Sequence, residues 1–210
     1  MKAFLGILML DTRFPRPPGD VGHAMSWRMP VRYRSVPGAS PQRVVRQRDP
    51  TLLQPFVEAA RALEAEGAAA ITTGCGFLIQ FQPALQAAVG VPLWTSSLLA
   101  LPTLRRPGVI TIDAASLRLD DATPVEGLAP GCALQRCLLE DLPELDAASA
   151  EADTVAAAQR LLQRHPGVEN LVLECTNLPP YADAVRQATG LPVHDILSLL
   201  HSRWLELDPR

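Results

Sequence analysis

The sequence predicts an α/β protein of two pseudo-symmetric lobes, each a parallel sheet flanked by helices, with the active-site cleft between the lobes. The main observation is a repeat: residues 67–92 recur in pattern a hundred positions later, at 167–192. In each copy an apolar run ends at a cysteine, Cys75 or Cys175, and a helical stretch, a Gly-x-Pro turn and a short apolar run follow. Strands that alternate with helices are typical of parallel sheets covered on both sides.

The repeat extends to the first strand of each half. Gly6 and Gly108 each open an apolar run that an aspartate closes five residues later, at Asp11 and Asp113. We therefore divide the chain into lobe 1, residues 1–106, and lobe 2, residues 107–210. Lobe 1 carries a long loop rich in proline and arginine at 13–49, and we allow for packing of the C-terminal helix against lobe 1. Since ligands of such sheets bind beyond the carboxyl ends of the strands, both cysteines and both aspartates should surround one cleft.

In lobe 1 the pattern predicts strands at 3–10, 67–73 and 92–94, and a short alternating strand at 31–36 inside the long loop. Helices are expected over about 50–66, after Cys75, and from Ser97 to about Leu104.

In lobe 2 strands are expected at 108–113, 171–173 and 192–194, and helices at 133–142, 147–165, 179–189 and near the C-terminus. The stretch 114–131 reads as a loop where a full helix would make the halves equal.

Composition excludes several classes of protein. A net charge of −3 with scattered arginines gives no basic surface for nucleic acid, and no apolar run approaches the ~20 residues that span a bilayer. The apolar N-terminal run reads as a buried strand rather than a signal peptide, so we expect a cytoplasmic protein. Lys2 is the only lysine, which argues against pyridoxal phosphate, and neither nucleotide fingerprint occurs. We therefore expect no cofactor. The four cysteines form no C-x-x-C pair, so we expect no metal, and a chain of this size without a secretion signal is not expected to form disulfides.

Two cysteines at equivalent strand ends suggest proton transfer. The N-terminus of the following helix favours a thiolate, and the ordinary thiol pKa of about 8.5 needs only a modest downward shift. One thiolate can remove a proton from carbon while a thiol on the opposite face returns one, which inverts the carbon. Cys75 and Cys175 are therefore the candidate catalytic pair. A buried cysteine is more often a small hydrophobic residue, and this is our interpretation of Cys132 and Cys137, which do not follow strands.

At this point the sequence resembles the aspartate/glutamate racemase superfamily, which includes hydantoin racemase, arylmalonate decarboxylase and maleate isomerase. The resemblance lies in Thr73-Gly-Cys75-Gly-Phe77, in Leu173-Glu-Cys175-Thr-Asn177-Leu-Pro179, and in Asp11-Thr12, where racemases carry Asp-Ser. It implies opposed acid and base cysteines in a cleft between two α/β lobes. The substrate contacts we expect are Asp11, Thr12, Gly74, Gly76, Phe77, Asp113, Thr176 and Asn177.

The motifs also depart from those of amino-acid racemases. The first cysteine is usually followed by Asn-Thr, but here by Gly76-Phe77, and Asn177 stands where glutamate racemases carry histidine. These changes count against plain aspartate or glutamate as the substrate. In the long loop, Arg13, Arg16 and Asp20 are near enough in sequence to the first strand to reach the cleft.

Our first functional hypothesis is a cofactor-independent racemase or epimerase, an isomerase acting on an amino acid or a related carbon acid. The first alternative is a lyase or isomerase like arylmalonate decarboxylase or maleate isomerase, in which one cysteine acts and the other is dispensable. The second is a non-catalytic small-molecule-binding protein on the same scaffold. We expect a small carboxylate or amino-acid-like substrate as partner, and the sequence leaves a homodimer open.

Overall fold

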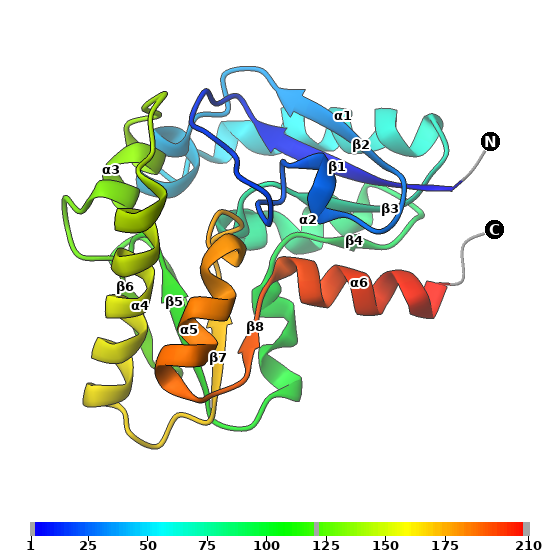
Figure 1. Ribbon diagram of the computed structural model, residues 1–210. Helices are drawn as coiled ribbons and strands as arrows, with labels where there is room; N and C mark the ends of the chain where they lie inside the picture. The colour runs from blue at the N-terminus through cyan, green and yellow to red at the C-terminus, as the bar shows by residue number, and fades with distance from the viewer. Residues whose placement is uncertain (1–2, 120–121, 208–210) are drawn as a thin grey trace.

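Two four-stranded parallel sheets form the framework of the protein, as the repeat predicted (Figure 1). A computed structural model describes residues 3–119 and 122–207. The strand orders are β2-β1-β3-β4 and β6-β5-β7-β8, so both halves have the same topology. The strands are β1 (Phe4–Leu10), β2 (Val31–Val36), β3 (Ala68–Thr73), β4 (Leu93–Trp94), β5 (Pro107–Thr111), β6 (Val125–Gly127), β7 (Asn170–Leu173) and β8 (Val193–His194).

The described residues form six α-helices, most of which pack on these sheets. α1 and α2 pack on the first sheet, and α4 and α5 on the second. The helices are α1 (Leu53–Ala65), α2 (Gln82–Ala87), α3 (Ala133–Leu139), α4 (Ala147–Arg164), α5 (Ala182–Thr189) and α6 (Ile196–Leu207). α4 begins where the sequence predicted a helix, and its cap residue Asp146 accepts from the backbone N–H groups of Ala148 and Ser149.

β1 is buried on both faces, because successive side chains of a strand point to opposite sides. Phe4, Leu8 and Leu10 pack into the core shared with α1. Leu5, Ile7 and Met9 face the other way, into a smaller cluster that contains residues of α6. Figure 1 shows α6 lying along the first sheet, on the side away from α1. The C-terminal helix therefore closes a face of the first sheet, although it follows β8 in the chain.

The structure differs from the expected elements in two segments. The helix expected near Ser97 is a 3₁₀ helix, Ser97–Thr103, and Pro102 within it has no N–H for an α-helical bond. The stretch 114–131, expected as a loop, contains the three-residue edge strand β6, in which Val125 pairs with Val109 of β5. The sheets are thus equal in strand number, and the halves differ in the connection before this strand.

Two buried hydroxyl groups join the first half of the chain to β7 and the residues after it. Ser97 Oγ donates to the carbonyl of Leu173 at 2.7 Å, and Thr176 Oγ1 donates to the carbonyl of Gly74 at 2.8 Å. Both side chains are almost fully buried. The first bond joins the segment after β4 to the end of β7, and the second joins the residues that follow β3 and β7.

Thr176→Val should lower the free energy of unfolding by about 1–2 kcal/mol, because the carbonyl of Gly74 loses its buried donor. Urea denaturation measures the loss. Thr103→Val is the control, since the exposed Thr103 bonds only to Ala100, one turn back. If both variants lost the same free energy of unfolding, the bond from Thr176 to Gly74 would not stabilise the contact between the two halves.

Candidate active site

The two cysteine segments lie against each other where β3 and β7 end. Gly74 N donates to the carbonyl of Leu8 at 2.7 Å, and Glu174 N donates to the carbonyl of Ile110 at 2.8 Å, which extends both ladders up to the cysteines. A Cβ added to Gly76 would lie only 2.1 Å from the carbonyl oxygen of Glu174. The repeat therefore brings its two copies into direct contact at the cysteine motifs.

Cys75 is only 8% exposed, and this burial decides its charge. Burial, and next the nearby Glu174, raise the pKa of the thiol to about 12. The backbone N–H groups of Phe77 and Leu78 and the guanidinium of Arg16 act in the opposite direction. The N–H donors expected from the following helix are thus present, but they do not lower the pKa below its ordinary value. Cys75 is a thiol at neutral pH in the ligand-free protein.

Cys175 is 5% exposed, and its thiol is also hard to ionise. Burial raises its pKa well above the ordinary value, and Glu174, Cys75 and Asp20 add to the effect. The N–H of Asn177 opposes it, and the side-chain oxygen of Asn177 lies 3.5 Å from the sulfur. The expected downward shift is therefore wrong for both thiols: removal from water outweighs the N–H donors.

Glu174 belongs to the second cysteine motif, although the sequence predicted no role for it. Its side chain is fully buried, and Oε2 accepts from Thr111 Oγ1 at 2.7 Å. Burial raises the pKa of this carboxyl to about 8, against the hydrogen bond from Thr111, which lowers it. Its signal in the sequence was a charged residue at the end of the apolar run 171–173.

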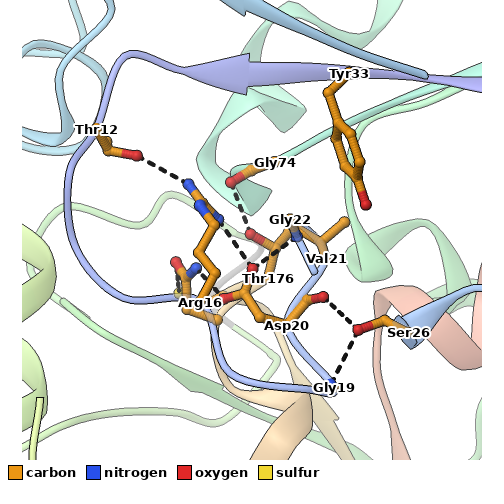
Figure 2. A network of polar contacts seen from close by, with 12 residues as sticks. Thr12, Arg16, Gly19, Asp20, Val21, Gly22, Ser26, Tyr33, Gly74 and Thr176 are labelled. Atoms are coloured by element: carbon orange, nitrogen blue, oxygen red, sulfur yellow. Dashed lines mark hydrogen bonds and ion pairs between the residues drawn. The ribbon is translucent and has the colours of Figure 1, made fainter. Parts of the chain in front are cut away.

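Part of the long loop folds onto the second cysteine motif, as Figure 2 shows. Asp20 is 1% exposed and accepts from Arg16 at 3.0 Å and from Asn177 Nδ2 at 2.6 Å. Arg16 also donates to Thr12 Oγ1 at 3.0 Å (Figure 2). Val21 N donates to the carbonyl of Thr176 at 3.4 Å. Arg16 and Asp20 thus form one polar network with Thr12 and Asn177.

The two strand-end aspartates hold loops instead of joining this network. Asp11 is exposed, and its carboxylate accepts from Gly38 N at 3.1 Å. Asp113 accepts from Arg46 Nε at 3.0 Å and from Ser116 Oγ at 2.6 Å. The carboxylate that bonds to the second cysteine motif is Asp20, which follows no strand and belongs to no repeat.

The remaining candidates lie at or near the contact between the two cysteine segments. Gly74, Gly76 and Thr176 make its contacts. Phe77 is buried and lines a cavity of about 140 Å³ between the two halves, which Arg48 and Arg118 also line. Arg13, by contrast, pairs with Asp141.

Cys132 and Cys137 lie apart from the two motifs, at the start of α3 and within it. Cys137 is 1% exposed and belongs to the hydrophobic core. All four cysteines are free thiols. Within residues 3–119 and 122–207, no three His, Cys, Asp or Glu side chains are grouped as a metal site, and no helix could cross a bilayer.

Solved structures show the fold. Unliganded arylmalonate decarboxylase matches with a TM-score of 0.61 and 18% identity, covering 98% of this chain and 92% of that one. An aspartate racemase homologue from Pyrococcus horikoshii OT3 gives 0.59 and 16%, covering 99% of each chain. Allantoin racemase from Pseudomonas fluorescens gives 0.59 and 17%, covering 97% and 90%. The two-lobed fold is that of the aspartate/glutamate racemase superfamily, as the motifs indicated.

The relatives closer in sequence carry a different activity in their names. A dimethylsulfoniopropionate lyase of Durusdinium sp. clade D is 33% identical over 218 residues, which cover 93% of this chain and 72% of that protein. The chain belongs to the dimethylsulfoniopropionate lyase family. Lyases 7 and 3 of Emiliania huxleyi (strain CCMP1516) are 30% and 31% identical over 94% of this chain. The chain spans 65% and 58% of their lengths. No family model matches the chain.

Membership in this lyase family corrects the main functional hypothesis. The expected racemase or epimerase, and the isomerase class with it, are wrong, because relatives over more than nine-tenths of the chain are lyases. The alternative, a lyase on a racemase-like scaffold, agrees with them. The motifs depart from those of the racemases at Gly76-Phe77 and at Asn177; Gly76 packs against Glu174, and Asn177 donates to Asp20.

Proposed function

We propose that this chain is a lyase that cleaves a small β-sulfonio carboxylate, such as dimethylsulfoniopropionate, by elimination with protein groups alone. The observation that carries the proposal is the direct contact of two cysteine segments in a chain of the dimethylsulfoniopropionate lyase family. The buried thiols and the Arg16–Asp20 network are what such a reaction needs: a base, a cation for the carboxylate, and exclusion of water.

The substrate's own structure defines the chemistry. The carbon next to the carboxylate loses a proton to a base, and the electron pair left behind forms the new carbon–carbon double bond. The bond between the β-carbon and the sulfonium sulfur breaks, and its electron pair leaves with neutral dimethyl sulfide. The products are acrylate, dimethyl sulfide and a protonated base. The leaving group needs no proton, so one base is sufficient.

Cys75 is the better placed of the two thiols to be that base. The N–H groups of Phe77 and Leu78 and the cation of Arg16 favour its thiolate, whereas Asp20 disfavours that of Cys175. A bound sulfonium cation would offset the effect of burial, since an opposite charge nearby lowers a thiol pKa. The thiol would then ionise only with substrate present, which protects it from side reactions in the free enzyme.

The carboxylate of the substrate needs a partner, and Arg16 fits that role. Its side chain is 15% exposed, and its guanidinium is fixed by Asp20 and Thr12. A fixed fork binds a carboxylate in one orientation. Asn177, Thr12 and the backbone at Gly74 and Gly76 complete the polar wall that we assign to the substrate.

The test is incubation of the purified chain with dimethylsulfoniopropionate in deuterated water. We expect the vinyl protons of acrylate in the proton NMR spectrum and an equal amount of dimethyl sulfide in the headspace. The double variant Cys75→Ser/Cys175→Ser should produce neither, and Cys132→Ser should match the wild type. Exchange of the α-protons with no release of dimethyl sulfide would contradict the proposal.

A further inference from the structure

The carboxyl group of Glu174 is wedged between the two cysteine segments. Glu174 precedes Cys175 in the chain, and its Oε1 lies 2.3 Å from where a Cβ on Gly76 would be. Any other residue at 76 would occupy the space that this oxygen fills. The carboxyl is therefore next to both cysteines, by sequence on one side and by packing on the other.

The hydrogen bonding of this carboxyl leaves one of its two oxygens without a partner. Oε2 accepts from Thr111 Oγ1 at 2.7 Å, while Oε1 is buried and has no hydrogen-bond partner among the described residues. A buried carboxylate with a single donor is costly, because charge removed from water needs several. Its pKa of about 8 reflects this. The carboxyl is therefore expected to keep its proton at neutral pH.

Each segment packed around Glu174 contributes a group that responds to its charge. Thr111 lies at the end of β5, Cys75 follows β3, and Cys175 is the next residue. Beyond them, Arg16 acts on Cys75, and its ion-pair partner Asp20 acts on Cys175. A negative charge on Glu174 raises the pKa of both thiols further, in addition to the effect of burial.

We propose that Glu174 is a positioning residue that permits thiolate formation at both cysteines while it keeps its proton, and suppresses it once that proton is lost. It would thus impose an alkaline limit on the site. The effect of Glu174 on catalysis rests on the proposed function. Its effect on the two thiols does not, because the test uses no substrate.

The test is the pH dependence of alkylation by iodoacetamide from pH 6 to 10, with each cysteine quantified by peptide mass spectrometry. In the wild type, alkylation of Cys75 and Cys175 should stop rising with pH once Glu174 ionises. In Glu174→Gln it should keep rising tenfold per pH unit. The ratio of variant to wild type should be near 1 at pH 6.5 and about 10 at pH 9, one unit above the pKa of about 8.

Cys132 provides the control within each sample. It is half-buried; burial raises its pKa, and the carboxyl group that adds to this effect is that of Asp153. Its alkylation should be the same in both proteins. A ratio for Cys75 and Cys175 that stays constant across the pH range would overturn the proposal. So would lower reactivity of the variant at every pH, which would make Glu174 a base that removes the thiol protons.

Thr111 supplies a second pair of variants that does not replace the carboxyl. The Thr111 hydroxyl lowers the pKa of Glu174, so Thr111→Val should move the alkaline limit to higher pH. Thr111→Ser keeps the hydroxyl and should restore the wild-type profile. If Glu174→Gln does not fold, the two Thr111 variants provide the test. The proposal is overturned if alkylation in Thr111→Val depends on pH in the same way as in the wild type. A failed lyase assay would leave these results unaffected.

Discussion

Gly76→Ala is expected to destabilise the protein by about 3 kcal/mol or more and to abolish most of its activity. The added Cβ would lie 2.1 Å from the carbonyl oxygen of Glu174, far below any real contact distance. Rotation of the Glu174 side chain cannot relieve the clash, because that oxygen belongs to the backbone. Overpacking of a buried joint usually costs about 1–3 kcal/mol, and more where backbone must move.

The variant should lose activity as well as stability, because the clash can be removed only by moving the two cysteine segments apart. Separation would break the bond from Thr176 to the carbonyl of Gly74 and displace Cys175 from Cys75. Urea denaturation measures the first effect and acrylate formation the second.

Gly167→Ala is the matched control for this substitution. A Cβ at Gly167, the exposed first residue of the second repeat copy, meets no atom within 4 Å. Its unfolding free energy should stay within about 0.5 kcal/mol of the wild type, as for most surface substitutions. If Gly76→Ala were no less stable than Gly167→Ala, the close packing of Gly76 on Glu174 would be incorrect.

The repeat explains why the fold could be predicted from the sequence. Each copy has the period of a buried strand and then of a helix, and such local patterns do not depend on distant residues. Even β2, inside the proline-rich loop, showed as the alternating run 31–36. The three-residue strand β6 was missed because its pairing with β5 determines it more than its own composition does.

The candidate site was harder to predict, because its most constrained residues depend on contacts distant in sequence. Asp20 lies in a loop without periodicity, and its bond to Asn177 joins residues 157 positions apart. Glu174 was visible in the motif, but its significance comes from Gly76, which is a hundred residues away. Asp11 and Asp113 did follow strands as expected, yet sequence could not show that each would bind its own neighbouring loop.

The electrostatics of the thiols were also beyond the sequence. A helix N-terminus after each cysteine argued for a lowered pKa, and N–H donors are indeed present at both sulfurs. The degree of burial is known only from the packed structure, and it turns the expected decrease of the thiol pKa into an increase. Substrate charge then becomes part of the mechanism, because it offsets a desolvation cost that the free protein leaves uncompensated.

Separate measurement of acrylate formation by Cys75→Ser and Cys175→Ser tests the central claim most directly. If one thiolate beside Arg16 removes the α-proton, Cys75→Ser should lose activity by about 10³-fold, the scale of a missing general base. Cys175→Ser should lose about tenfold or less, because elimination needs no second proton transfer. Circular dichroism verifies that both variants are folded. Equal large losses in the two variants, or a greater loss in Cys175→Ser, would contradict a one-base elimination at Cys75.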